Sequence, residues 1–125
     1  MKEQKAPLTG IKLLVAEDDA VIAMDYAAML CSAGAEVVAT TRTAADAITQ
    51  LQQHRVDAAI VDFVLADANS SALQAILTQK HIPFVVISGY PSVLVRESRD
   101  QHVLHKPVTA DNLCAAVLAV CNRAP

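Results

Sequence analysis

Short apolar runs that alternate with helical patterns constrain the fold of this 125-residue chain most strongly. The runs are rich in Val, Ile and Leu and nearly continuous. Such runs are typical of strands that are covered on both faces, as in a parallel sheet. The predicted strands are residues 12–16, 36–40, 58–62, 84–88 and 102–105, and the last has the weakest pattern.

Helical spacing of apolar residues predicts the segments between the strands. The expected apolar stripes are Val21, Met24, Met29 and Ala33 in the first helix, Ala44, Ala47, Ile48 and Leu51 in the second, Leu73, Ile76 and Leu77 in the third, and Leu113, Val117, Val120 and Cys121 in the last. Gly34 is expected to end the first helix. Thr43, with Asp46 three residues later, resembles a capping box that opens the second. A short helix is also expected over residues 91–99.

The alternation of strand and helix, repeated five times, predicts an α/β fold. Right-handed crossovers would then produce a doubly wound parallel sheet with helices on both faces. We expect a flexible tail at residues 1–9 and one domain over residues 10–125, because a chain of this length has room for one core. Hydrophobic residues make up 54% of the chain and aromatic residues 3%, so the core is expected to be aliphatic.

Composition and charge argue against several classes of function. A formal net charge of −3 disfavours a nucleic-acid binder, which usually presents a basic face. Since no apolar stretch is long enough for a signal peptide or a membrane span, we expect a cytoplasmic protein. Cys31, Cys114 and Cys121 are odd in number and lack metal-binding spacing, so they are expected to be reduced.

Polar side chains stand at the predicted carboxyl ends of four strands. They are Glu17, Asp18 and Asp19 after the first strand, Asp62 at the end of the third, Ser88 at the end of the fourth and Lys106 after the fifth. In a doubly wound sheet, ligands bind beyond this edge of the strands. We therefore expect these side chains to meet there, except Asp19, which is expected to cap the first helix.

This set of side chains suits a phosphoryl group bound beside a divalent cation. Carboxylates that are drawn together repel one another unless a cation is present. Ligands that are all oxygen favour a hard ion, for which Mg²⁺ is the natural choice. A lysine and a hydroxyl would neutralise and hydrogen-bond the phosphoryl oxygens.

The motifs and their order resemble the receiver domain of response regulators in two-component systems. The matching segments are Val-Ala-Glu-Asp-Asp (15–19), Ile-Val-Asp-Phe-Val-Leu (60–65), a hydroxyl residue at the end of the fourth strand and His-Lys-Pro (105–107). The segment Pro-Phe-Val-Val-Ile-Ser-Gly-Tyr (83–90) is further similar to the FATGUY subclass, found largely in alphaproteobacterial stress and envelope signalling. The resemblance covers residues 11–122 and implies a flavodoxin-like sheet with strand order 2-1-3-4-5.

The resemblance also implies a role for each acidic residue of the motifs. Asp62 would be the phosphoacceptor and a ligand of Mg²⁺. Asp18 would bind Mg²⁺ directly, and Glu17 directly or through water. The backbone carbonyl of Val64 would complete the ligands that the protein supplies.

The remaining motif residues would act on the phosphoryl group. Ser88 would donate a hydrogen bond to it and Lys106 would pair with it, with a cis peptide before Pro107. Two departures from the family pattern stand out. Val103 occupies the position where many receivers have an aromatic switch residue, and the loop at residues 66–69 lacks the usual Pro-x-x-x-Gly, which leads us to expect a mobile segment after Asp62.

The implied function is to accept a phosphoryl group from the phosphohistidine of a sensor histidine kinase or a histidine phosphotransfer protein. Such a protein is no enzyme beyond its own phosphorylation and dephosphorylation. It would be a stand-alone monomer or weak homodimer that acts through a protein effector, without nucleic acid or membrane. The alternatives are a receiver cut from a hybrid kinase and a pseudo-receiver that only binds partners. A phosphatase is disfavoured because Val64 stands where that chemistry needs a general acid.

Overall fold

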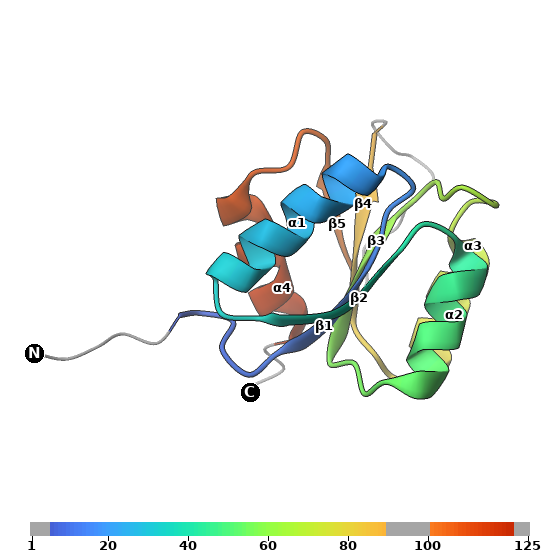
Figure 1. Ribbon diagram of the computed structural model, residues 1–125, viewed down its shortest axis with the longest axis horizontal. Helices are drawn as coiled ribbons and strands as arrows, with labels where there is room; N and C mark the ends of the chain where they lie inside the picture. Colours follow the sequence, from blue (N-terminus) through green and yellow to red (C-terminus); the bar gives the residue numbers. More distant parts are fainter. Residues whose placement is uncertain (1–5, 90–100, 122–125) are drawn as a thin grey trace, which may run out of the picture.

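The computed structural model describes residues 6–89 and 101–121, which form a five-stranded parallel sheet between two layers of helices (Figure 1). The elements in chain order are β1 (Lys12–Ala16), α1 (Ala20–Ser32), β2 (Glu36–Thr41), α2 (Ala44–Gln53), β3 (Ala58–Asp62), α3 (Ser71–Gln79), β4 (Phe84–Ser88), β5 (Gln101–His105) and α4 (Ala110–Cys121). The strand order β2-β1-β3-β4-β5 confirms the predicted order. The helix expected over residues 91–99 lies outside the described residues.

Two aliphatic cores lie on opposite faces of the sheet. Helices α1 and α4 cover one face, and α2 and α3 cover the other (Figure 1). Alternate side chains of a strand point to opposite faces. Leu13 and Val15 of β1 accordingly pack in the core with α1 and α4, whereas Leu14 and Ala16 pack in the core with α2 and α3.

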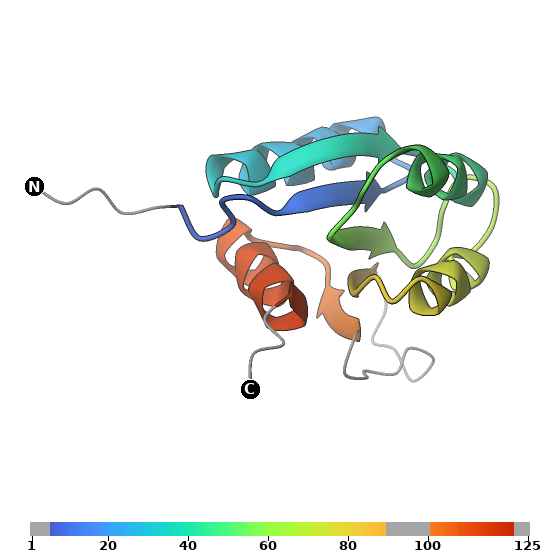
Figure 2. The ribbon, with the colours of Figure 1, turned by 90° about the horizontal axis from the view of Figure 1, so that it is seen from below.

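All five strands are parallel, so their carboxyl ends share one edge; in Figure 2 the arrowheads of β1, β2 and β3 point to this edge. Every residue of β3 and β4 is buried. Such complete burial is expected for the most apolar strands of a parallel sheet, which helices cover on both faces. The central strands therefore form a rigid base for the residues that follow them.

Two helix starts and one helix end agree with the sequence prediction. Asp19 caps α1, because its side chain accepts hydrogen bonds from the backbone N–H groups of Val21 and Ile22. Thr43 caps α2 and accepts from the N–H of Asp46. Helix α1 ends just before Gly34, whose φ of 103° is accessible to glycine and strained for other residues.

Half of the predicted apolar stripe of the first helix is wrong, although Met29 and Ala33 pack against the core as expected. Val21 and Met24 are 67% and 69% exposed, while Ala23, Tyr26 and Leu30 are the buried residues of α1. This helix is apolar around most of its circumference, so spacing alone does not determine which side packs on the sheet.

The packed part of the chain begins earlier than the predicted domain start at residue 10. Leu8 is fully buried in the core beside α1 and α4, and its N–H donates to the carbonyl of Ala33 over 2.8 Å. A tail over all of residues 1–9 is therefore too long.

Among the described residues, none of the helices has both the length and the apolar character needed to cross a bilayer.

Residues 6–9 pack closely on Gly34, so we expect a side chain at this position to destabilise the fold. A Cβ at Gly34 would lie 2.7 Å from Thr9 Oγ1 and 2.8 Å from Ala6 Cβ, whereas a Cβ at Gly10, where φ is 87°, would meet nothing within 4 Å. Gly10→Ala should cost about 1 kcal/mol for its positive φ. Gly34→Ala should cost about 3 kcal/mol, because steric overlap adds to the backbone strain.

Urea denaturation of both variants and the wild-type protein measures these losses. Equal losses for the two substitutions would show that the packing of residues 6–9 on Gly34 contributes nothing to stability.

Candidate functional site

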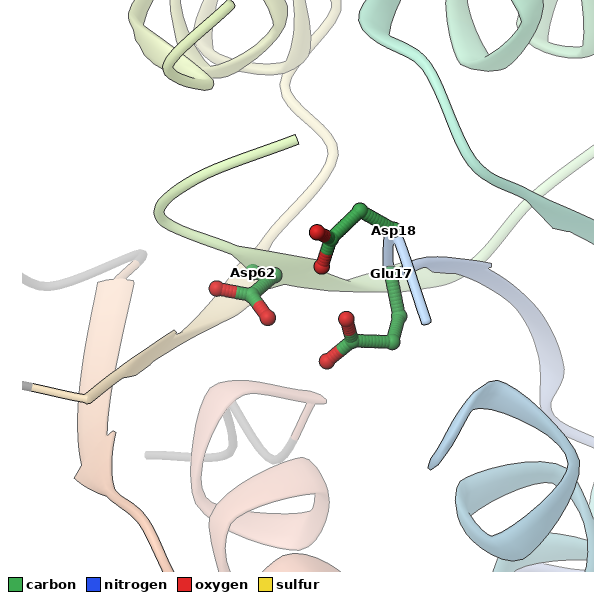
Figure 3. A group of neighbouring side chains, drawn as sticks. All are labelled: Glu17, Asp18 and Asp62. Atoms are coloured by element: carbon green, nitrogen blue, oxygen red, sulfur yellow. The ribbon is translucent and has the colours of Figure 1, made fainter. Parts of the chain in front are cut away.

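Glu17, Asp18 and Asp62 converge at the carboxyl edge of the sheet (Figure 3). Strands β1 and β3 are neighbours, and Ala16 pairs with Val61. The residues that follow this pair therefore emerge side by side. One carboxylate oxygen of each acid lies within 4.8 Å of the others.

Lys106 reaches this acid cluster from the end of β5, an edge strand of the sheet. It follows β5, and its backbone N–H donates to the carbonyl of Ser88 over 2.9 Å. Its Nζ donates to Asp62 Oδ2 over 2.9 Å and lies 3.5 Å from Glu17 Oε1. The lysine thus contacts two of the three acids, and the peptide that follows it, before Pro107, is cis as expected.

A small open cavity of about 320 Å³ lies over the cluster. Its described lining consists of Asp18, Asp62, Val64, Gly89 and Lys106. The N–H of Val64 donates to Asp62 Oδ1 over 3.2 Å, which holds the start of the next loop against the acid. Asp62 is only 4% exposed, yet the cavity gives a small molecule access to its carboxylate.

Ser88 and Gly89 complete this edge at the end of β4. Ser88 is buried and directly follows Ile87, the residue of β4 that pairs with Asp62. A Cβ at Gly89 would lie 4.0 Å from Lys106 Cδ, so this glycine borders the lysine. The sequence offered no signal for Gly89 beyond its position after the strand.

Burial and repulsion between acids dominate the electrostatics of Glu17. Its side chain is fully buried, and Oε2 accepts the N–H of Asp19 over 2.9 Å. Among the residues that the structure describes, Oε1 has no hydrogen-bond partner. Burial, followed by the neighbouring carboxylates of Asp62 and Asp18, raises the pKa of Glu17 to about 8. Without a cation, the site therefore favours the protonated form of Glu17, and a bound cation would favour its charged form.

Two neighbouring groups have pKa shifts that preserve their charged forms. The hydrogen bond with Glu17 lowers the pKa of Asp18. Burial acts to lower the pKa of Lys106, but the hydrogen bond and charge of Asp62 and the charge of Glu17 outweigh it, so that the pKa is raised. Lys106 thus stays a cation at neutral pH.

The residues present fit a hard divalent cation. Three closely spaced carboxylates supply oxygen ligands only. Among the described residues, Glu17 Oε1 has no hydrogen-bond partner and only the Lys106 ammonium 3.5 Å away, so it is a buried acceptor that a cation would satisfy. Oxygen donors at this spacing are the ligands that Mg²⁺ prefers. Glu17, Asp18 and Asp62 could therefore hold a metal ion at this edge.

The segment after Asp62 forms several hydrogen bonds within itself. The N–H of Leu65 donates to the carbonyl of Ala68 over 2.8 Å, and the N–H of Ser70 donates to that of Phe63 over 2.8 Å. Val64 also forms a bridge with Asn69.

Val103, which replaces the aromatic switch residue, is partly buried in β5 and packs against the core with α2 and α3.

Known proteins of similar sequence are regulators. The Mycobacterium tuberculosis protein PdtaR, a transcriptional regulatory protein, is 29% identical over 117 residues, which cover 90% of this chain and 57% of PdtaR. The chain thus spans little more than half the length of this curated relative.

Solved structures of similar fold give the same picture. SdrG from Sphingomonas melonis has 33% identity and a TM-score of 0.75, with 91% of this chain and 97% of SdrG covered. The anti-anti-sigma factor PhyR from Bartonella quintana has 28% identity and a TM-score of 0.76, with 87% of this chain and 46% of PhyR covered. The family model for the response regulator receiver domain matches residues 13–118. The chain therefore belongs to the response regulator receiver family, and the acid cluster and Lys106 lie within the matched residues.

Proposed function

We propose that the chain accepts a phosphoryl group on Asp62 from a phosphohistidine, in the presence of Mg²⁺. The observation that carries this proposal is the contact of Lys106 with Asp62 at an open cavity beside two further acids. This arrangement presents a nucleophilic carboxylate, a fixed cation and a set of metal ligands at one point. Phosphoryl transfer depends mainly on such positioning and charge stabilisation.

The transfer needs one bond to form and one to break. A carboxylate oxygen of Asp62 attacks phosphorus, and the bond between phosphorus and the imidazole nitrogen of the donor breaks. The electron pair of that bond returns to the imidazole, and Asp62 becomes an acyl phosphate. Lys106 would stabilise the negative charge on the phosphoryl oxygens, and the buried Ser88 would donate a hydrogen bond to them.

Glu17, Asp18 and Asp62, with the backbone carbonyl of Val64, would hold Mg²⁺. A bound Mg²⁺ supplies charge neutralisation between the acids and the incoming phosphoryl group. The buried position of Glu17 supports this role, since an uncompensated carboxylate there is otherwise costly.

The donor would be a sensor histidine kinase or a histidine phosphotransfer protein, and the output a contact with a protein effector. The names of PdtaR and of the anti-anti-sigma factor PhyR support a role in gene regulation. We infer a FATGUY-type receiver from residues 83–90. The alternative is a pseudo-receiver that binds partners without phosphorylation, and the complete set of Asp62, Lys106 and acidic neighbours argues against it.

Replacement of the phosphoacceptor tests the proposal directly. Wild-type protein incubated with Mg²⁺ and a small acyl phosphate should gain one phosphoryl adduct in intact-mass analysis, and the adduct should be lost without Mg²⁺. Asp62→Asn should gain none, because the amide is not a nucleophile of this kind. The control is Asp111→Asn on the exposed start of α4, which should be phosphorylated as the wild type is.

Two outcomes would contradict this expectation. An adduct that persists in Asp62→Asn would place the phosphoryl group elsewhere. No adduct in folded wild-type protein, from the acyl phosphate or from a phosphohistidine donor, would favour the pseudo-receiver.

Replacement of the lysine should separate metal binding from transfer. Lys106→Met removes a positive charge 2.9 Å from Asp62, so Mg²⁺ should bind more tightly. Phosphorylation at saturating Mg²⁺ should slow by about a hundredfold, because a charge that stabilises the transition state is lost. Titration calorimetry measures the first effect and timed intact-mass analysis the second.

The exposed Lys80 provides the matched control, and Lys80→Met should change neither quantity. An unchanged transfer rate in Lys106→Met would remove the lysine from the mechanism.

Helix α1 presents an apolar surface next to the site, where a protein donor would have to approach. Val21 and Met24 are exposed on this helix. Ile22 of the same helix lines a neighbouring cavity of about 400 Å³ together with Lys106 and Pro107, so this helix borders the lysine. We infer that the donor protein docks here.

The double substitution Val21→Ser and Met24→Ser tests the docking surface. The protein donor in this test is a purified phosphotransfer protein that phosphorylates the wild-type chain. The double substitution should slow transfer from this donor by about tenfold, since buried apolar contacts dominate such interfaces. The rate with a small acyl phosphate should not change, because Asp62 and Lys106 are untouched. Gln52→Ala on the exposed surface of α2 is the control. Equal slowing with both donors would indicate damage to the site instead of lost docking.

A further inference from the structure

Arg42 contacts both of the loops that carry the acid cluster and its neighbours. It lies between β2 and α2 and is exposed. Its side-chain Nε donates to the backbone carbonyl of Asp18 over 3.0 Å. Its own backbone carbonyl accepts the N–H of Ala66 over 3.0 Å. One residue therefore connects the loop after β1 with the loop after β3.

Asp67 adds a second connection from the loop after β3. Its Oδ1 accepts the N–H of Ala44 over 2.8 Å, and its Oδ2 accepts the N–H of Ala45 over 3.2 Å. These are the first two residues of α2, so Asp67 caps a helix that begins 23 residues earlier in the chain. The position favours the carboxylate, because a helix N-terminus attracts negative charge.

Two side chains, those of Thr43 and Asp67, accept hydrogen bonds from the backbone N–H groups in the first turn of α2. The N–H of Asp46 donates to Thr43 Oγ1 over 3.0 Å, and the N–H of Ala47 donates to the carbonyl of Thr43 over 3.1 Å. The bond from Ala47 is the first helical one, and Asp67 accepts from Ala44 and Ala45. The N–H groups of the first three residues of α2 are thus all satisfied by acceptors outside the helix, two of them in a distant loop.

These contacts restrain the loop that begins directly after the phosphoacceptor. The N–H of Leu65 donates to the carbonyl of Ala68, which closes a tight turn with Asp67 at its tip. Val64, at the base of this turn, lines the cavity over the acid cluster. The hydrogen bond from Ala44 is the main cause that lowers the pKa of the Asp67 carboxyl, so the cap is charged at neutral pH.

We propose that Arg42 and Asp67 are positioning residues that set the distance between the Asp18 loop and the Asp62 loop, and thereby the affinity for Mg²⁺. Neither side chain touches Asp62, so neither is a catalytic residue. The proposal rests on the metal site of the proposed function. It adds that the segment from Arg42 to Ala45, which leads into α2, acts as an anchor to which both ligand-bearing loops are attached.

A role in helix stability alone is the competing explanation, and Asp46 separates the two. Asp46 is also an exposed acid in the first turn of α2, so its removal subjects the helix to a similar loss of charge. Its side chain belongs to α2 itself and does not tie that helix to the loop after β3. A change that appears on replacing Asp67 and not on replacing Asp46 therefore reports on the loop connection.

The experiment measures Mg²⁺ affinity by titration calorimetry on the full chain for the wild type, Asp67→Ala, Asp67→Asn and Asp46→Ala. Asp67→Ala should weaken Mg²⁺ binding by about tenfold, the usual scale for the loss of a residue that orients metal ligands. Asp67→Asn loses the same charge but keeps an amide oxygen that can accept one N–H, so it should recover part of the affinity. Asp46→Ala should stay within about twofold of the wild type, because an isolated exposed charge contributes little.

Arg42→Met provides an independent test if Asp67→Ala does not fold. It removes the Nε donor to Asp18 and also a positive charge, which by itself would tighten Mg²⁺ binding. Weaker binding in this variant can therefore come only from the lost positioning. Arg42→Lys, which keeps the charge without the Nε geometry, should be weakened as well.

The outcomes for this proposal and for the proposed function are distinct. Equal affinities for Asp67→Ala and Asp46→Ala, with unchanged binding in Arg42→Met, would overturn the positioning role. Mg²⁺ binding by a wild-type protein that forms no adduct would contradict the phosphoryl transfer and leave the affinity comparison valid. A wild-type protein that binds no Mg²⁺ would overturn both.

Discussion

The pairing of buried carboxylates with Lys106 is the interaction on which the rest of the site depends. Glu17 is fully buried and Asp62 is almost so, and charged groups in such positions are costly unless they are paired. The lysine bonds to Asp62 and the N–H of Asp19 bonds to Glu17, but one oxygen of Glu17 lacks a hydrogen-bond partner among the described residues. The fold thus holds three carboxyl groups close together, and a bound cation would stabilise their charged forms.

The stability that holds this charge comes from the sheet below it. All residues of β3 and β4 are buried, and aliphatic cores cover both faces. Because neighbouring strands are parallel and in register, Asp62, Ser88 and the residues after Ala16 emerge at one edge with little freedom. The surrounding loops are attached to one another through Arg42 and Asp67, so the edge is organised laterally as well as from below.

Much of the fold and most of the acid cluster could be predicted, because each prediction relied on a local pattern. Continuous apolar runs identified the strands, and polar residues at the ends of those runs identified Glu17, Asp18, Asp62 and Lys106. The buried side of α1 was predicted only in part, since the helix is apolar nearly all round. The hydrogen bonds that link the loop after Asp62 to Arg42 and Ala44 could not be predicted, because these residues are distant from the loop in sequence.

The sequence by itself determined the order of strands and helices, the caps at Asp19 and Thr43 and the residue types at each strand end. These features depend on side chains within a few positions of one another. Only the tertiary structure decided that Lys106 reaches Asp62 and Glu17, that Leu8 joins the core and that Asp67 caps α2. Each of these contacts links segments that are separated along the chain. Their geometry depends on how helices pack on a twisted sheet, and no local pattern encodes it.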